Sequence, residues 1–314
     1  MRRAWVTTTC VAAGMACGGA ALAQQAPEAA SATSLSPPPE ARLGEPAVTQ
    51  DVAEGVAEAT DDRWSLRAEI GAWYVGLGGD LKLPGSISAG NGQEFNLDDL
   101  GLDSPKLVPT AEANLFFGPI YRGTVRGYQV SSDQDQIIPV ASQLGRVAIP
   151  AGQAIRTTFD FGSLELEAGA RVWQDGGRAR LDDGRLSYIG DLAVFAGLQV
   201  IDVDWSARRV SGGGESSDYE QVFVLARGGA KWSMVFREEF TVDLTIGVGA
   251  SPLGDASAFT GDIIAGFAWE PHPNFGIQIG YRAAQFNLSE GDDPEEFSFT
   301  GGNQGLQAGI VLKF

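Results

Sequence analysis

The last nine residues of the chain alternate between apolar side chains and polar or small ones. Gln307, Gly309 and Lys313 fall on one face. The opposite face is made by Leu306, Ala308, Ile310, Leu312 and Phe314. A period of two is that of a β-strand, and about ten such residues ended by an aromatic make a strand that crosses a bilayer. The pattern predicts a terminal membrane strand with Phe314 at the membrane boundary.

The amino-terminal end predicts export. A basic start at Arg2 and Arg3 is followed by an apolar stretch and by a small-x-small cleavage site at residues 21–23. We therefore expect residues 1–23 to be a signal peptide. A competing interpretation makes Cys17 the lipid-modified first residue of a lipoprotein, because small residues surround its thiol.

Both cysteines, Cys10 and Cys17, lie in this leader, so the mature chain has neither disulfides nor thiolate metal sites. No later stretch reaches the roughly 20 apolar residues of a spanning helix. A membrane location therefore requires strands. Because hydrocarbon offers no partner to backbone polar groups, the strands have to close into a barrel.

The charge of the chain limits its partners. Without Arg2 and Arg3, the mature protein has 20 basic against 40 acidic side chains, a net charge of about −20. Nucleic acid is excluded as a partner, since binding to phosphate backbones depends on a surplus of Lys and Arg. The acidic surplus is compatible with loops beside lipopolysaccharide, where divalent cations bridge acidic groups. It is equally compatible with loops kept soluble by charge.

Residues 24–62 differ in composition from the rest of the chain. They are rich in Ala, Ser and Gln, poor in large apolar groups, and contain five prolines. Such a segment cannot bury a core. We expect a disordered, acidic periplasmic linker that ends where the barrel begins, so that the barrel spans residues 63–314.

Alternation with period two recurs from residue 64 to the end of the chain. We expect strands at residues 64–74, 111–117, 121–128, 164–172, 192–203, 222–232, 240–248, 263–269, 275–281 and 306–314. The fold class is therefore all-β, a transmembrane antiparallel up-and-down barrel of about ten strands. Eight and twelve strands are the alternatives.

The connections predict the orientation, because outer-membrane barrels have short periplasmic turns and longer outer loops. Short turns are expected at residues 118–119, 237–239 and 271–274. Longer outer loops are expected at residues 79–106, 131–157, 207–220, 251–258 and 288–303. The connection at 174–190 is long for a periplasmic turn and leaves room for an extra hairpin.

From residue 64 to residue 314 the chain resembles small monomeric barrels grouped as OmpA-like, or outer-membrane β-barrel domain, proteins. The resemblance rests on Asn-Leu-Asp-Asp-Leu-Gly-Leu-Asp at 96–103, on Ala-Gly-Leu-Gln-Val-Ile-Asp-Val-Asp at 196–204 and on Gly-Tyr-Arg at 280–282. The usual Arg-Tyr pair of the second motif is Gln199-Val200 here. These motifs are moderately specific for fold and imply little about activity.

The resemblance implies a monomer in the outer membrane of a Gram-negative bacterium, in contact with outer-membrane lipid and lipopolysaccharide. The terminal strand resembles the one that the barrel assembly machinery recognises. Residues 306, 308, 310, 312 and 314 are therefore the expected assembly signal. No cofactor is implied.

Charged residues at inward positions are the candidate site. We expect a lumen-facing network that either plugs the barrel or lines a narrow pore, with pairing as the default because unpaired charges away from water are costly. Its members are Glu69, Glu112, Arg122, Arg126, Glu165, Glu167, Arg171, Arg227, Lys231 and Arg282. Inward glycines such as Gly247 leave space beside them. As a plug, the network predicts that Arg126→Ala opens the pore.

Catalytic and metal-binding signals are weak. Barrel enzymes that modify lipid or cleave protein place a His near the outer rim, as a base for acyl transfer or for activating water. The one His, His272, lies in an expected periplasmic turn, so we expect no enzyme. Scarce His also argues against a transition metal. Asp98, Asp99 and Asp103 are weak calcium candidates beside a solvated acidic loop.

Three functions compete at this point. The first is a structural or interaction role in the cell envelope, which we favour. The second is a narrow, porin-like channel for small or apolar solutes, although about ten strands enclose a space that side chains nearly fill. The third is a lipid-modifying enzyme.

Overall fold

The computed structural model describes residues 64–86, 94–176, 181, 184, 187–210, 216–251, 256–292 and 296–314. The expected signal peptide at residues 1–23, with its alternative at Cys17, and the expected linker at residues 24–62 lie outside the described residues. The barrel expected from residue 63 has its first described residue at Trp64, which begins a strand. No helix among the described residues is long and apolar enough to cross a membrane.

All the regular structure described is strand. The elements are β1 (Trp64–Lys82), β2 (Glu94–Asn96), β3 (Lys106–Phe117), β4 (Tyr121–Ile138), β5 (Ser142–Leu144), β6 (Val147–Ile149), β7 (Gln153–Gly176), β8 (Tyr188–Arg209), β9 (Ser216–Phe236), β10 (Phe240–Ser251), β11 (Ala256–His272), β12 (Phe275–Glu290) and β13 (Phe297–Lys313). β2, β5 and β6 are short additions at one end.

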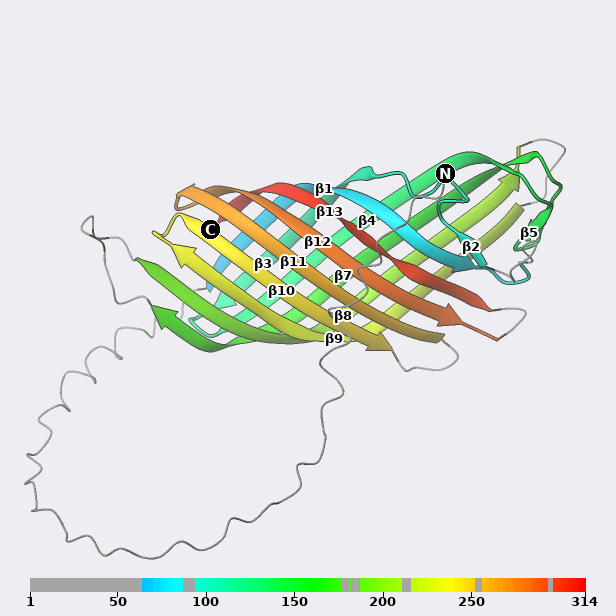
Figure 1. Cartoon of the computed structure of the whole chain (residues 1–314). Coiled ribbons are helices and arrows are strands. Elements are labelled where there is room, and N and C mark those ends of the chain that lie inside the picture. The colour runs from blue at the N-terminus through cyan, green and yellow to red at the C-terminus, as the bar shows by residue number, and fades with distance from the viewer. Residues whose placement is uncertain are drawn as a thin grey trace, which may run out of the picture. The chain divides into compact units, whose positions relative to one another are not determined.

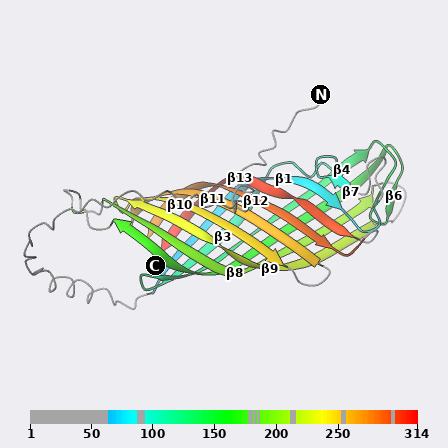
Figure 2. The same ribbon diagram turned by 60° about the horizontal axis from the view of Figure 1, so that its bottom comes forward.

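Ten strands pair with their neighbours in chain order and close into a barrel (Figure 1). Closure is made by β1 and β13, which pair antiparallel from Arg67 opposite Lys313 to Lys82 opposite Ser298. A second view shows the same strands wrapping around one axis (Figure 2). The ten-strand barrel predicted from the alternation is confirmed, and the alternatives of eight and twelve strands are wrong. β7 and β8 pair directly as far as Gly176 opposite Ile189, so the long connection there adds no strand to the wall.

The outward face of the barrel carries an apolar belt. Side chains such as Ile70, Val125, Leu166 and Ile279 are largely exposed there. Exposed aromatics border the belt on both sides, with Tyr74, Phe259 and Tyr281 at one edge and Trp64, Phe117, Tyr121, Trp173, Trp269, Phe275 and Phe314 at the other. An apolar band between aromatic girdles is the lipid face of a transmembrane barrel. Trp64, the first residue of β1, and Phe314 lie at the same edge. The short turns also lie there, so we assign this edge to the periplasm.

β4, β7, β8 and β9 continue beyond the ends of the other strands of the wall (Figure 1). β4 runs to Ile138 and β7 begins at Gln153, inside the stretch expected to be an outer loop at 131–157. The loops expected at 79–106, 207–220, 251–258 and 288–303 are likewise shortened by continuing strands. Their outward side chains turn polar beyond the hydrocarbon, so the alternation of lipid-facing residues ends while backbone pairing goes on.

We call the part of β4, β7, β8 and β9 that lies beyond the belt the extension. Its outward face is acidic, with Asp160, Asp204 and Glu220 directly opposite one another on β7, β8 and β9. Partial burial, Asp160 and Glu220 raise the pKa of Asp204. Asp202 also lies on this face, so it and Asp204 stand outside the hydrocarbon, as expected from the cost of a charge in lipid.

The short turns lie where the sequence predicts them. Gly118 has a positive φ of 59° between β3 and β4, which glycine adopts without a steric penalty. Arg237 and Glu238 turn β9 into β10 with φ values of 53° and 61°. His272 ends β11 at the next turn of this rim. These turns lie at the periplasmic edge, together with the first residue of β1, Trp64, and the last residue of the chain, Phe314.

Candidate functional site in the lumen

The inward face of the membrane-spanning strands carries a charged layer with equal numbers of both signs. Eight inward side chains are basic: Arg67, Arg122, Arg126, Arg171, Arg227, Lys231, Arg282 and Lys313. Eight are acidic: Glu69, Glu112, Glu165, Glu167, Asp191, Asp243, Asp262 and Glu270. A neutral total is what a lumen with little water tolerates, since each uncompensated charge is costly there.

Glu165 on β7 is the centre of this layer. Its side chain is 1% exposed and accepts hydrogen bonds from Arg126 at 2.8 Å and Arg282 at 2.5 Å. Arg227 lies 3.5 Å away. One carboxylate thus holds guanidinium groups from β4, β12 and β9. Because these strands lie on different sides of the barrel, the ion pairs of Glu165 connect separate parts of the wall across the lumen.

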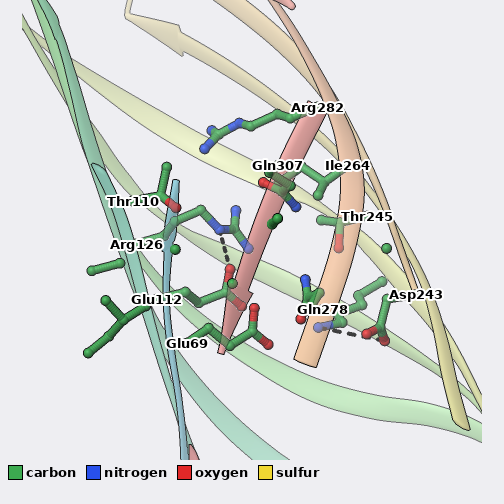
Figure 3. Close-up of a pocket in the computed structure, with 17 residues that line it drawn as sticks. Glu69, Thr110, Glu112, Arg126, Asp243, Thr245, Ile264, Gln278, Arg282 and Gln307 are labelled. Atoms are coloured by element: carbon green, nitrogen blue, oxygen red, sulfur yellow. Dashed lines mark hydrogen bonds and ion pairs between the residues drawn. The ribbon is translucent and has the colours of Figure 1, made fainter. Parts of the chain in front are cut away.

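Two branches extend from this centre. Arg126 donates to Glu112 on the neighbouring strand at 2.5 Å, as Figure 3 shows. Arg227 donates to Glu167 at 2.8 Å and lies 2.6 Å from Asp262. Inward glycines were expected to leave space in the lumen. At Gly247 the Arg227 guanidinium fills that space, because a Cβ there would lie 2.3 Å from it.

Two like charges face each other near the periplasmic end. Glu69 on β1 and Glu112 on β3 are directly opposite, an arrangement that is destabilising unless cations offset it. Arg67 forms an ion pair with Glu69 at 3.1 Å, and Arg126 forms one with Glu112. Figure 3 shows both carboxylates beside the same small cavity, with Arg282 farther along the barrel.

The outer half of the lumen is apolar. Phe159 and Phe161 of β7 are fully buried, with Phe161 4.6 Å from Phe286 and Phe159 5.5 Å from Phe299 between ring centres. Further buried groups come from the segment after β2 and from the β5–β6 hairpin: Leu97, Leu100, Leu102, Leu144, Val147 and Ile149. We call this set the apolar core. Strands and loops both contribute to it, so it fills the outer end of the barrel.

Arg282 joins the charged layer to the apolar core. Its guanidinium lies 4.6 Å from the ring centre of Tyr128 and 5.5 Å from that of Trp73 while it donates to Glu165. A cation over an aromatic face is stabilised by the ring quadrupole, more so when it is desolvated. The two layers are therefore continuous.

The lumen holds two cavities of very different size. One, of about 60 Å³, lies inside the charged layer between Glu69, Glu112, Arg126 and Arg282 (Figure 3). It has room for a few waters. The other, of about 480 Å³, lies at the periplasmic mouth. We call it the vestibule.

Most of the predicted network is brought together, with different partners from those expected. Arg126 bonds Glu112 as predicted, but its second partner is Glu165, and Glu69 pairs with Arg67. Lys231 lies 3.8 Å from Asp243. The expectation that all members pair is wrong for Arg122 and Arg171. Arg171 bonds the neutral Gln174, and Arg122 has no ion pair in the described residues.

Several charged and apolar lumen residues were not included in the predicted network. They are Arg67, Asp191, Asp243, Asp262, Glu270 and Lys313, together with the apolar core. Parity along each strand was the available signal. Asp262, for example, precedes the lipid-facing Ile263, and Phe161 and Phe159 share the parity of Glu165.

The remaining candidates have defined positions. The expected assembly signal, residues 306, 308, 310, 312 and 314, faces outward beside β1, with Phe314 69% exposed. His272 is exposed at the periplasmic rim. Asp98 and Asp99 are exposed and Asp103 is half-buried, and no three acidic, His or Cys residues among those described are placed to hold a metal ion.

Comparison with known proteins yields a likeness of fold. No family model and no curated protein sequence matches the chain. Among solved structures, the outer-membrane protease OmpT of Escherichia coli is 12% identical, with a TM-score of 0.47, 80% of this chain covered and 97% of that one. The attachment invasion locus protein Ail of Yersinia pestis is 13% identical, with a TM-score of 0.31 and coverages of 80% and 99%. The Pseudomonas putida toluene transporter TodX is 9% identical, with a TM-score of 0.26 and coverages of 82% and 91%.

Likenesses at this level transfer no activity. The closed barrel and its lipid face themselves confirm the predicted class, a transmembrane β-barrel of the outer membrane of a Gram-negative bacterium. The narrower OmpA-like grouping has no matching family model.

Proposed function

We propose that this protein is a sealed outer-membrane barrel with a structural or interaction role in the cell envelope. The apolar core carries this proposal. Conduction needs a continuous wet path, and in the described residues the outer half of the lumen is filled by side chains such as Phe159, Phe161 and Phe299, each with no exposed surface. The charged layer beneath them adds a second barrier.

The surface offered for interaction is the extension. It is built of continuous strands, so it holds a fixed face outside the membrane. Its carboxylates begin directly above the belt, at the level of lipopolysaccharide headgroups, where divalent cations bridge acidic groups. Outer-membrane lipid, lipopolysaccharide and, during biogenesis, the barrel assembly machinery are the partners we propose for a monomer of the OmpA-like group.

A non-enzymatic role is part of the proposal. Acyl transfer or proteolysis in a barrel of this kind needs a base beside a nucleophile or water. His272 lies at the exposed periplasmic turn, away from the extension and from Glu165. The buried carboxylates Glu112, Glu165 and Glu167 are held by arginines, which suits cross-bracing better than proton transfer.

Planar-bilayer recording of the purified protein tests the sealed barrel. We expect no steady conductance from the wild type. Arg126→Ala, expected from the sequence to open a pore, should also stay closed, because the apolar core lies in series with the charged layer. Combining Arg126→Ala with Phe161→Ser and Phe299→Ser should produce conductance, because water then reaches both layers.

The control for folding is heat-modifiable migration on a gel, which shows whether each variant is a closed barrel. Large, steady conductance in the folded wild type would overturn the proposal in favour of the channel. Arg126→Ala conducting alone would show that the charged layer is the only barrier.

A further inference from the structure

The vestibule contains more basic groups than its ion pairs use. Five basic side chains line it: Arg67, Arg122, Arg171, Lys231 and Lys313. Three of them have carboxylate partners, at 3.1 Å for Arg67, 3.8 Å for Lys231 and 2.5 Å for Lys313. The other two, Arg122 and Arg171, have no carboxylate in an ion pair within the described residues. This pair stands apart from the rest of the charged layer.

Arg122 is inward-facing and only partly exposed, yet its side chain makes no hydrogen bond or ion pair in the described residues. Glu167 is its diagonal neighbour on β7, and Glu112 lies on the adjacent strand β3. Both are already engaged, Glu112 by Arg126 and Glu167 by Arg227. A guanidinium in a lumen without a counter-charge is costly. Arg122 is therefore the guanidinium of the vestibule that is most available to a ligand.

The position of Arg171 strengthens this assignment. Arg122 lies opposite Gly169, and Arg171 is the next inward position on the same strand, so the two arginines are diagonal neighbours. Gly169 itself contributes no side chain between them, and a Cβ at this position would lie 3.3 Å from the Phe195 Cβ. Asp191 also lines the vestibule and forms an ion pair with neither arginine in the described residues.

We propose that the vestibule binds a phosphate group that reaches it from the periplasmic side, with Arg122 and Arg171 as its ligands. Guanidinium forks match phosphate oxygens in bidentate fashion, and a tetrahedral oxyanion offers oxygens to two forks at once. The cavity of about 480 Å³ has room for such a group. The bound anion stays in the vestibule, since the charged layer blocks its way onward.

The phosphate has two possible sources. One is a soluble phosphate compound of the periplasm. The other is the headgroup of a phospholipid in the inner leaflet, because the vestibule is also lined by Ile120, Tyr121 and Phe314, whose side chains are exposed on the outer face of this rim. The same two arginines would hold the phosphate in either case.

Thermal unfolding of the full chain in detergent tests the site with inorganic phosphate as the probe. Phosphate is titrated at constant ionic strength, with chloride as the balancing anion. A ligand that binds only the folded state raises the unfolding midpoint by mass action, so the wild-type midpoint should rise. Arg122→Gln and Arg171→Gln should each weaken apparent phosphate affinity about tenfold, the loss of one charge-assisted contact. Equilibrium dialysis with labelled phosphate should likewise show weaker phosphate binding by each of the two variants than by the wild type.

The matched control is Arg156→Gln on the extension, where the arginine bonds Asp135 at 2.5 Å far from the vestibule. It should keep the full phosphate response. Without phosphate, Arg122→Gln should be at least as stable as the wild type, because no carboxylate loses its partner. That result separates a binding role from a structural one.

Nanodiscs distinguish the sources. Loss of the phosphate response in phosphatidylglycerol nanodiscs, with retention in phosphatidylcholine nanodiscs, would identify a competing anionic headgroup. Retention in both would identify a soluble phosphate. An unresponsive wild type in detergent, or an equal response in Arg122→Gln, would overturn the site. These outcomes do not depend on whether the barrel conducts.

Discussion

Replacing Glu165 by Ala should be among the most destabilising single changes in the barrel. Three guanidinium groups, those of Arg126, Arg227 and Arg282, converge on this carboxylate. Removing one partner from a buried ionic cluster leaves the others without compensation, at a cost of about 3–5 kcal/mol. We expect a loss of that order in the free energy of unfolding, measured by urea denaturation of the refolded protein in detergent, with the folded band on a gel as a second readout.

An exposed ion pair of the same kind provides the matched control. Asp135 on the extension bonds Arg156 in bidentate fashion, and both side chains are more than 40% exposed. The Arg156 guanidinium lowers the pKa of Asp135. Solvent screens this pair, so Asp135→Ala should change the stability little. The loss of unfolding free energy for Glu165→Gln should lie between those of Glu165→Ala and Asp135→Ala, because glutamine keeps hydrogen bonds but not the charge. Similar losses for Glu165→Ala and Asp135→Ala would contradict the assignment of Glu165 as the centre of the layer.

Replacing Phe314 by Ser should sharply lower the amount of assembled barrel in cells. The backbone of Phe314 makes the last rung of the closing seam, donating to the Leu66 carbonyl at 2.8 Å and accepting from the Leu66 amide at 3.0 Å. Phe314→Ser keeps this rung and removes only the aromatic. Deleting Phe314 removes both and should lower the level further. Quantifying the heat-modifiable folded species in outer-membrane fractions measures the effect.

The stability of the purified variant shows whether the effect lies in assembly or in folding. The Phe314 side chain is 69% exposed, so Phe314→Ser refolded in detergent should be within roughly 0.5 kcal/mol of the wild type. Trp64→Ser is the matched control, because Trp64 is an exposed aromatic at the same rim but on the first strand of the barrel, β1. It should leave the cellular level nearly unchanged. Equal losses for the two substitutions would mean that any rim aromatic serves, and that Phe314 is no signal.

The barrel wall could be predicted from the sequence because lipid imposes a regular pattern on it. Each crossing strand shows apolar residues at every second position, as at Phe240 to Val248, so the strand count and the periplasmic turns followed. The extension could not be predicted in the same way. Beyond the hydrocarbon the outward residues of β7 include Asp160 and Arg156. Polar and charged residues in contact with water occur on strands and on loops alike, so their pattern in the sequence does not distinguish a strand from a loop.

The charged lumen was predicted only in part. Parity along the strands placed Arg126 and Glu112 inside and on adjacent strands, and they bond as expected. The contacts of Glu165 with Arg282 and Arg227 cross the lumen between strands distant in the sequence. Such partners depend on the curvature of the wall and on side-chain lengths, which no local pattern encodes.

The sequence by itself determined that this is a barrel of about ten strands and which face of each crossing strand meets the lipid. The reason is that a backbone in hydrocarbon has few solutions, and the lipid face has to be apolar. Only the tertiary structure decided whether the lumen is open. Phe161 points inward because of its position on β7. It seals the lumen only because distant strands, and the segment that carries Leu100, pack together with it in one cluster. The same holds for Arg122, whose lack of an ion pair among the described residues is a property of the assembled lumen and of no single strand.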